Sequence, residues 1–146
     1  MIIGFTGHRK LNNLEQVQIE LEQLLSELKP EKCISGIAIG FDTLAAEICI
    51  KLNIPFIAAV PFYGQEKVWP DFAKERYNKL LKWANEVKYV CSPGYAAWKM
   101  QKRNEWIVNN CELLIAAWDG KESGGTYNCI KYAKDVGREI KYLNVV

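Results

Sequence analysis

The chain has 146 residues, of which 49% are hydrophobic and 25% charged, a composition that excludes a disordered or fibrous protein. Its 19 basic and 17 acidic residues give a net charge of only +2, and no apolar run is long enough to span a bilayer. The five cysteines form no CxxC pair or other metal-binding spacing. We therefore expect one domain over residues 1–146, in the cytoplasm, without a bound metal or a membrane partner.

Short apolar runs alternate with helical patterns along the chain. Most of the runs are continuously apolar, as in strands covered on both faces. They predict six strands, over residues 2–5, 33–35, 56–60, 87–90, 113–117 and 140–143. Apolar residues at helical spacing, with capping residues before them and proline or glycine after them, predict helices over 14–28, 43–52, 72–84, 97–110 and 127–136.

This alternation of strands and helices indicates a parallel sheet wrapped by helices. The predicted fold is a single Rossmann-like, three-layer α/β domain with a mostly parallel sheet of about six strands. In such sheets a ligand lies at the carboxyl ends of the strands. The loops at those ends are therefore the first place to look for a site.

The loop after the first strand reads Thr6-Gly7-His8-Arg9. Gly7 allows a tight turn, and the guanidinium of Arg9 is suited to bind a phosphate bidentately. His8 is the only histidine of the chain; it either contacts a ligand or bonds to nearby backbone.

The loop after the second strand, residues 35–42, carries two glycines and an aspartate. Gly36 and Gly40 let the backbone approach a ligand closely. Asp42 accepts hydrogen bonds from a ribose hydroxyl or caps the following helix. The alternative is a turn and helix cap without a ligand.

The strongest signal is Ser123-Gly124-Gly125-Thr126, between the strand at 113–117 and a helix. Unpaired backbone amides at the start of a helix, with hydroxyl donors beside them, form an anion site, usually for phosphate. The alternative is a tight turn in which the glycines only permit the backbone geometry. Just upstream, Asp119 caps locally or holds a ribose hydroxyl.

Further candidates come from two tryptophans and from the helix at 97–110. Trp69 and Trp118 either stack on a base or belong to the core. Arg103 and Asn104 are proposed ligand contacts, although a solvated helix face is the default for such residues. The chain has no GxxxxGK[ST], strict GxGxxG, serine elbow or HExxH motif, so it offers a binding site more clearly than a catalytic one.

Residues 35–42 and 123–126 together resemble the motifs of the SLOG superfamily, named for Smf/DprA and LOG proteins. More narrowly, the chain resembles the YpsA-like branch. The motifs concerned are Thr6-Gly7-His8-Arg9, Pro61-Phe62 followed by Gln65 and Trp69, Arg76-Tyr77, Lys102-Arg103-Asn104 and Trp118-Asp119-Gly120. The resemblance covers nearly the whole chain.

The resemblance implies a Rossmann-like domain that binds nucleotides or nucleotide-derived ligands at these loops. LOG enzymes carry a glutamate three residues after the motif threonine, where this chain has Cys129, so the resemblance favours a binder over a LOG-type hydrolase. DprA-type proteins carry an arginine and a histidine where this chain has Ile39 and Ala46. With the near-neutral charge, this leads us not to expect nucleic acid as a partner.

Three hypotheses follow. The first is a sensor or sequestering protein, in bacterial or phage defence, for a nucleotide or an NAD- or ADP-ribose-derived signalling ligand, with no cofactor required. The second is an enzyme that cleaves an N-glycosidic or phosphoester bond; no catalytic residue is assigned, and the acid–base candidates are His8, Asp42, Asp119 and Glu122. The third is a nucleic-acid or protein interaction module, supported by the basic residues within 99–103.

A homo-oligomer, a dimer or higher, is expected because tryptophans and tyrosines exceed the needs of one small core.

Overall fold

The computed structural model describes residues 1–145, in which strands and helices alternate from end to end. The strands are β1 (Ile2–Gly7), β2 (Lys32–Ser35), β3 (Phe56–Val60), β4 (Glu86–Tyr89), β5 (Leu113–Ala117) and β6 (Glu139–Leu143). The helices are α1 (Leu14–Leu28), α2 (Phe41–Lys51), α3 (Asp71–Trp83), α4 (Ala97–Asn109) and α5 (Gly124–Asp135). Each predicted strand and helix is present, with ends that differ by up to three residues.

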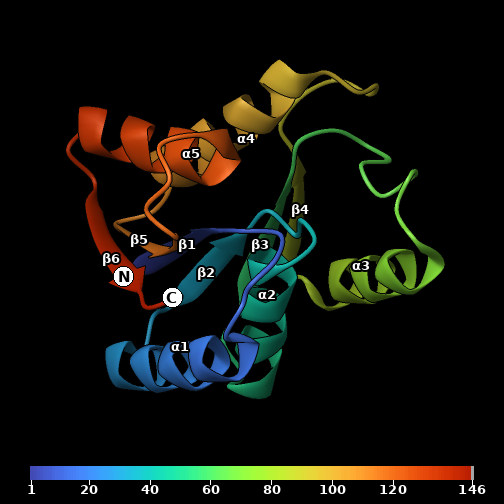
Figure 1. Ribbon diagram of the computed structural model, residues 1–146. Helices are drawn as coiled ribbons and strands as arrows, with labels where there is room; N and C mark the ends of the chain where they lie inside the picture. Colours follow the sequence, from blue (N-terminus) through green and yellow to red (C-terminus); the bar gives the residue numbers. More distant parts are fainter. Residues whose placement is uncertain (146) are drawn as a thin grey trace.

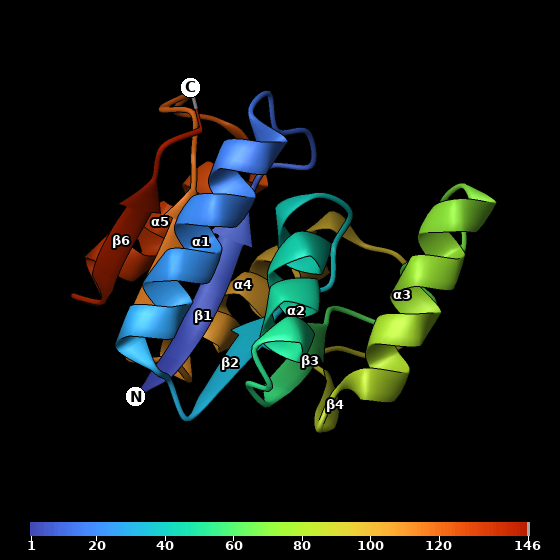
Figure 2. The ribbon, with the colours of Figure 1, turned by 90° about the horizontal axis from the view of Figure 1, so that it is seen from below.

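All six strands form one parallel sheet in the order β4-β3-β2-β1-β5-β6. The chain builds outward from β1 to β4 and then returns to the other side of β1 for β5 and β6. Figure 1 shows α4 and α5 on one face of the sheet, and Figure 2 shows α1, α2 and α3 on the opposite face. The predicted Rossmann-like α/β fold is confirmed, and its switch point lies between β1 and β5.

Burial explains why the central strands are apolar throughout. Every residue of β3 (FIAAV) and of β5 (LLIAA) is buried, and the alanines let the helices approach the sheet closely. On one face, α1 contributes Val17, Leu21 and Leu25 to the core. On the other face, Ile107 and Val108 of α4 pack with Cys129 of α5.

The outer strands differ from the predicted pattern of strands buried on both faces. In β4 (EVKY) and β6 (EIKYL) most residues are exposed or half-buried. Their charged residues suit a sheet edge, where lysine and glutamate discourage pairing with another chain. Over residues 1–145, no helix has the length and apolar character that crossing a membrane requires.

Helix α5 begins at Gly124, three residues before its predicted start. The Ser-Gly-Gly-Thr motif is thus the cap and first turn of the helix itself. Sequence periodicity missed this turn because glycine contributes no apolar side chain to the pattern.

A close approach at Gly40 joins the loop after β1 to the start of α2. Gly40 has a φ of +101°, and a Cβ atom there would collide with the backbone carbonyl of Arg9. Beside it, the amide of Phe41 donates to the carbonyl of His8 at 3.1 Å. Only glycine allows both the backbone conformation and the contact.

We predict that Gly40→Ala lowers the free energy of unfolding by about 1–3 kcal/mol, because the methyl group adds both strain and a clash. Urea denaturation measures the change. Gly125→Ala is the matched control, since a Cβ atom at Gly125 meets no atom within 4 Å and the φ of Gly125 is not positive. Equal midpoints for Gly40→Ala and the wild type would contradict this account of the loop.

Candidate ligand-binding cleft

A cleft of about 340 Å³ opens at the carboxyl end of β1, between the first turns of α2 and α5 and the side of α4. This is the switch point of the sheet, where parallel α/β folds bind their ligands. The lining residues are Thr6, Gly7, His8, Arg9, Ala38, Ile39, Asp42, Gln65, Trp69, Met100, Arg103, Asn104, Ser123, Gly124, Gly125 and Thr126.

Most of the predicted site residues come together in this cleft. Gly36, Gly40, Trp118 and Asp119 do not line it. The cleft also contains residues that sequence reasoning did not select. Of these, Thr6, Ala38 and Ile39 lie within the motifs already singled out and Gln65 belongs to a family motif, whereas Met100 carried no signal.

The start of α5 presents unpaired backbone donors to the cleft. Ser123 occupies the N-cap in an extended conformation (φ −158°, ψ 158°), and its side chain makes no capping hydrogen bond. The first turn contains no acidic residue that would neutralise the helix dipole. The amides of this turn therefore carry the partial positive charge that binds an anion.

Gly125 lies in that turn without a structural requirement for glycine. It differs from the other glycines of the described residues, because it has neither a positive φ nor a neighbour that a Cβ atom would touch. Alanine would stabilise a helix at this position by roughly 0.5–1 kcal/mol. What glycine provides here is a bare backbone surface facing the cleft.

Arg103 of α4 lies buried beneath the cleft. Its Nη1 donates to the carbonyl oxygens of Gly36 (2.9 Å) and Ala59 (3.3 Å), and its Nε donates to Oδ1 of Asn104 (3.1 Å). A Cβ atom at Gly36 would lie 2.5 Å from Nη1, so this glycine makes room for the guanidinium. Burial lowers the pKa of Arg103, yet an arginine stays charged in proteins.

The expectation that the basic residues of α4 lie on a solvated helix face is therefore wrong for Arg103 and Lys99. Lys99 is also buried, and its Nζ donates to the carbonyl oxygens of Ser92 (2.8 Å), Pro93 (3.2 Å) and Gly94 (2.8 Å). Only Lys102 behaves as expected, since its side chain is exposed and pairs with the half-buried Glu105. Carbonyl groups of neighbouring loops and strands satisfy the two buried cations, which the periodicity of one helix cannot reveal.

Asp42, at the start of α2, is 8% exposed and faces the cleft. Its Oδ2 accepts a long hydrogen bond from the amide of Ala38 (3.4 Å), whereas Oδ1 has no partner. Burial raises the pKa of Asp42 to about 6, and the charge of Arg103 opposes the shift. A buried carboxylate oxygen without a hydrogen-bond partner is uncommon in folded proteins and marks Asp42 as a candidate functional residue.

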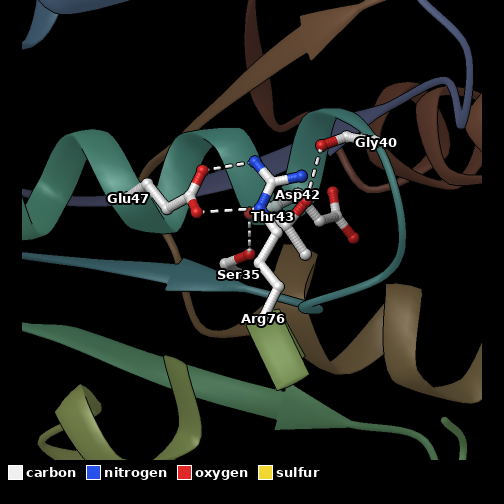
Figure 3. Close-up of polar contacts among 6 residues, drawn as sticks. All are labelled: Ser35, Gly40, Asp42, Thr43, Glu47 and Arg76. Atoms are coloured by element: carbon white, nitrogen blue, oxygen red, sulfur yellow. Dashed lines mark hydrogen bonds and ion pairs between the residues drawn. The ribbon is translucent and has the colours of Figure 1, made fainter. Parts of the chain in front are cut away.

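Figure 3 shows how α2 is held in position. Ser35 Oγ donates to the carbonyl oxygen of Asp42 at 2.8 Å, and Thr43 Oγ1 donates to that of Gly40 at 2.9 Å. Further along the helix, Glu47 forms a two-pronged ion pair with Arg76 of α3. These contacts fix the first turn of α2, and with it the carboxyl group of Asp42.

At the rim, His8 bridges to the loop after β5. Its Nε2 accepts from the amide of Asp119 at 3.0 Å and lies 3.1 Å from Oδ1 of Asp119. The amide of Lys121 donates to that carboxylate and holds the pKa of Asp119 below its usual value. Arg9 also lines the cleft, and its guanidinium has no ion pair or hydrogen bond to any described residue.

The two candidate tryptophans have different surroundings. Trp69 lines the cleft and packs edge-on against Tyr77, with ring centroids 5.3 Å apart. Trp118 stacks on Tyr127 (6.1 Å), and its Nε1 donates to the carbonyl of Lys121. Trp69 is thus the tryptophan that a ligand in the cleft would touch.

Comparison with known proteins places these features in a family. Residues 7–145 match the YpsA family model, described as the YspA SLOG family. The SPbeta prophage-derived protein YoqJ of Bacillus subtilis is 37% identical in an alignment of length 131 that covers 78% of this chain and 75% of that protein. A UPF0398 protein of Lysinibacillus sphaericus is 26% identical over 58% of this chain and 51% of its own length.

Two solved structures share the fold. DNA processing protein A (DprA) from Streptococcus pneumoniae has a TM-score of 0.74 at 21% identity over 96% of this chain. DprA from Helicobacter pylori, described by its single-stranded DNA binding mode, has a TM-score of 0.73 at 17% identity over 99% of this chain. This chain corresponds to 49% of the first protein and 65% of the second.

The expectation that nucleic acid is not a partner is wrong, because the same fold serves single-stranded DNA binding in Helicobacter pylori DprA. That expectation rested on the net charge of +2 and on the side chains at Ile39 and Ala46. Net charge does not reflect the unpaired backbone amides at the start of a helix or the position of a buried arginine.

We predict that Asp42→Asn raises the free energy of unfolding by about 2–3 kcal/mol at pH 8, and that this gain disappears as the pH falls towards 4. The folded pKa of about 6 lies above the unfolded value. The buried carboxylate therefore costs stability fully above pH 6 and not at all below the unfolded pKa. Urea denaturation of both proteins from pH 4 to 8 measures the difference; a gain that is independent of pH would contradict the assignment.

Proposed function

The chain belongs to the YspA SLOG family. On the basis of the cleft at the switch point of its sheet, we propose that it binds a nucleotide-type ligand through a phosphate group and does not cleave the ligand. The observation that carries the proposal is Gly125. Neither backbone conformation nor packing calls for glycine there, whereas a phosphate lying on the first turn of α5 does.

Each group around the cleft has a role in this proposal. The amides of residues 124–126 and the hydroxyl of Thr126 hold the phosphate, and the unpaired guanidinium of Arg9 neutralises it. The carboxyl group of Asp42, which lines the cleft, accepts a hydrogen bond from a ribose hydroxyl. Trp69 covers the base.

The ligand class that we propose is a nucleotide or an NAD- or ADP-ribose-derived signalling molecule, which the protein senses or sequesters. A volume of about 340 Å³ lies within the range of small-molecule sites. The 37% identity to a prophage-derived protein supports a role at the interface between phage and host.

A nucleotide-cleaving enzyme is the second candidate, because a carboxyl group whose pKa is about 6 inside a cleft suits acid–base chemistry. The position of the LOG glutamate speaks against a LOG-type reaction. It is held by Cys129, which is fully buried in the core and does not line the cleft. Any catalysis would therefore depend on Asp42 and the groups at the rim.

A thermal-shift screen against nucleotides, NAD, ADP-ribose, cyclic ADP-ribose isomers and cyclic dinucleotides tests the proposal. A ligand at a hundred times its dissociation constant adds about 2.7 kcal/mol, or roughly 5–10 °C in Tm. We predict that Gly125→Asp abolishes the shift, because its carboxylate takes the place of the phosphate. Gly125→Ala should weaken binding while leaving the unliganded Tm unchanged or slightly higher.

Loss of binding in Gly125→Asp can be distinguished from loss of folding, because an aspartate in the first turn interacts favourably with the helix dipole and should not destabilise α5. Full affinity in Gly125→Asp would refute the phosphate position. Chromatography of the recovered ligand decides between the candidates: an intact ligand supports the binder, and a cleaved ligand supports the enzyme.

A further inference from the structure

A second hollow, which we call the tyrosine groove, lies between the loop after β3, helix α3 and the loop after β4. Its volume is about 740 Å³, more than twice that of the cleft. Its walls carry the aromatic rings of Phe62, Tyr63, Tyr89 and Tyr95. The phosphate-binding function proposed above does not use these residues.

The rings of Tyr63, Tyr89 and Tyr95 in the tyrosine groove are open to solvent. Tyr63 is 71% exposed and Tyr95 76% exposed. Tyr63 leans on Tyr89 with ring centroids 5.8 Å apart, and Tyr95 meets the buried Phe62 edge-on at 6.1 Å. Three tyrosines from separate segments thus present aromatic surface without forming an enclosed pocket.

The tyrosine groove also carries positive charge. Lys67 and Lys74 line it, and neither ammonium group forms an ion pair or a hydrogen bond within the described part of the chain. Glu66 is the one acidic residue of the lining. Unpaired cations beside exposed aromatic rings are the combination found in single-stranded nucleic-acid sites.

Gln65 joins the tyrosine groove to the cleft, since it lines both. Its Nε2 donates to the carbonyl oxygen of Gly36 (3.3 Å), which also accepts from Arg103. The groove lies by the edge strand β4, and the phosphate site lies over β1. Three strand spacings separate them, or about 14 Å, which is farther than a base extends from its own phosphate.

We propose that the tyrosine groove stacks the bases of a single-stranded nucleic acid, one phosphate of which occupies the cleft. The inference rests on the proposed phosphate site and extends it from one nucleotide to a strand. A small ligand is ordinarily enclosed over most of its surface, whereas the rings of Tyr63 and Tyr95 are largely exposed. A strand running across the β4 edge would cover them.

The test is fluorescence anisotropy with a labelled twelve-residue oligothymidylate at low salt, using the full chain. The double variant Tyr63→Ala/Tyr95→Ala should weaken binding about tenfold or more, and Tyr63→Phe should bind like the wild type because it keeps the ring. Phe72→Ala is the matched control, since Phe72 is 74% exposed on α3 and does not line the groove. These side chains are exposed, so each variant should fold.

The outcomes separate this inference from the proposed function. If oligothymidylate binds, and Gly125→Asp weakens this binding but the double tyrosine variant does not, the proposed role of the tyrosine groove is overturned and the phosphate site stands. If a nucleotide of the thermal-shift panel binds but oligothymidylate does not, the inference is likewise overturned. If neither binds, both proposals fail.

Discussion

The buried guanidinium of Arg103 is the interaction on which the cleft depends. Its bonds to the carbonyl groups of Gly36 and Ala59 tie α4 to the ends of β2 and β3. Gly36 must be a glycine for the guanidinium to reach its carbonyl. A buried cation whose hydrogen bonds go to carbonyl oxygens keeps a full positive charge beneath the cleft without closing the space above, as the proposed phosphate site requires.

Around this centre, two of the residues proposed for binding, Asp42 and Gly125, are ones that make the fold less stable. The carboxylate of Asp42 is buried with an unpaired oxygen, and Gly125 occupies a helical position where alanine is the better residue. By contrast, the contacts of Ser35 and Thr43 with the first turn of α2 stabilise it. Residues that destabilise the fold inside the cleft, next to contacts that stabilise it, are the pattern expected of a functional site.

Sequence patterns predicted the architecture because apolar runs and helical spacing report burial directly, as in β5 and α1. They also predicted where most cleft residues lie, since the ends of parallel strands meet. They misjudged the exposure of Arg103 and Lys99, because the main-chain carbonyls that bind these buried cations leave no mark in composition. Sequence patterns could not predict the tyrosine groove, because Tyr63, Tyr89 and Tyr95 lie on separate segments that only the tertiary fold brings together.

The contacts of Lys99 link the cleft to the tyrosine groove. It clasps the carbonyl groups of residues 92–94, immediately before Tyr95, and stands one helical turn from Arg103 on the same side of α4. One rigid rod therefore positions both the floor of the cleft and a wall of the tyrosine groove. The distance between the two hollows is therefore fixed by the fold, so a molecule that occupied both would have to match that distance in its own length.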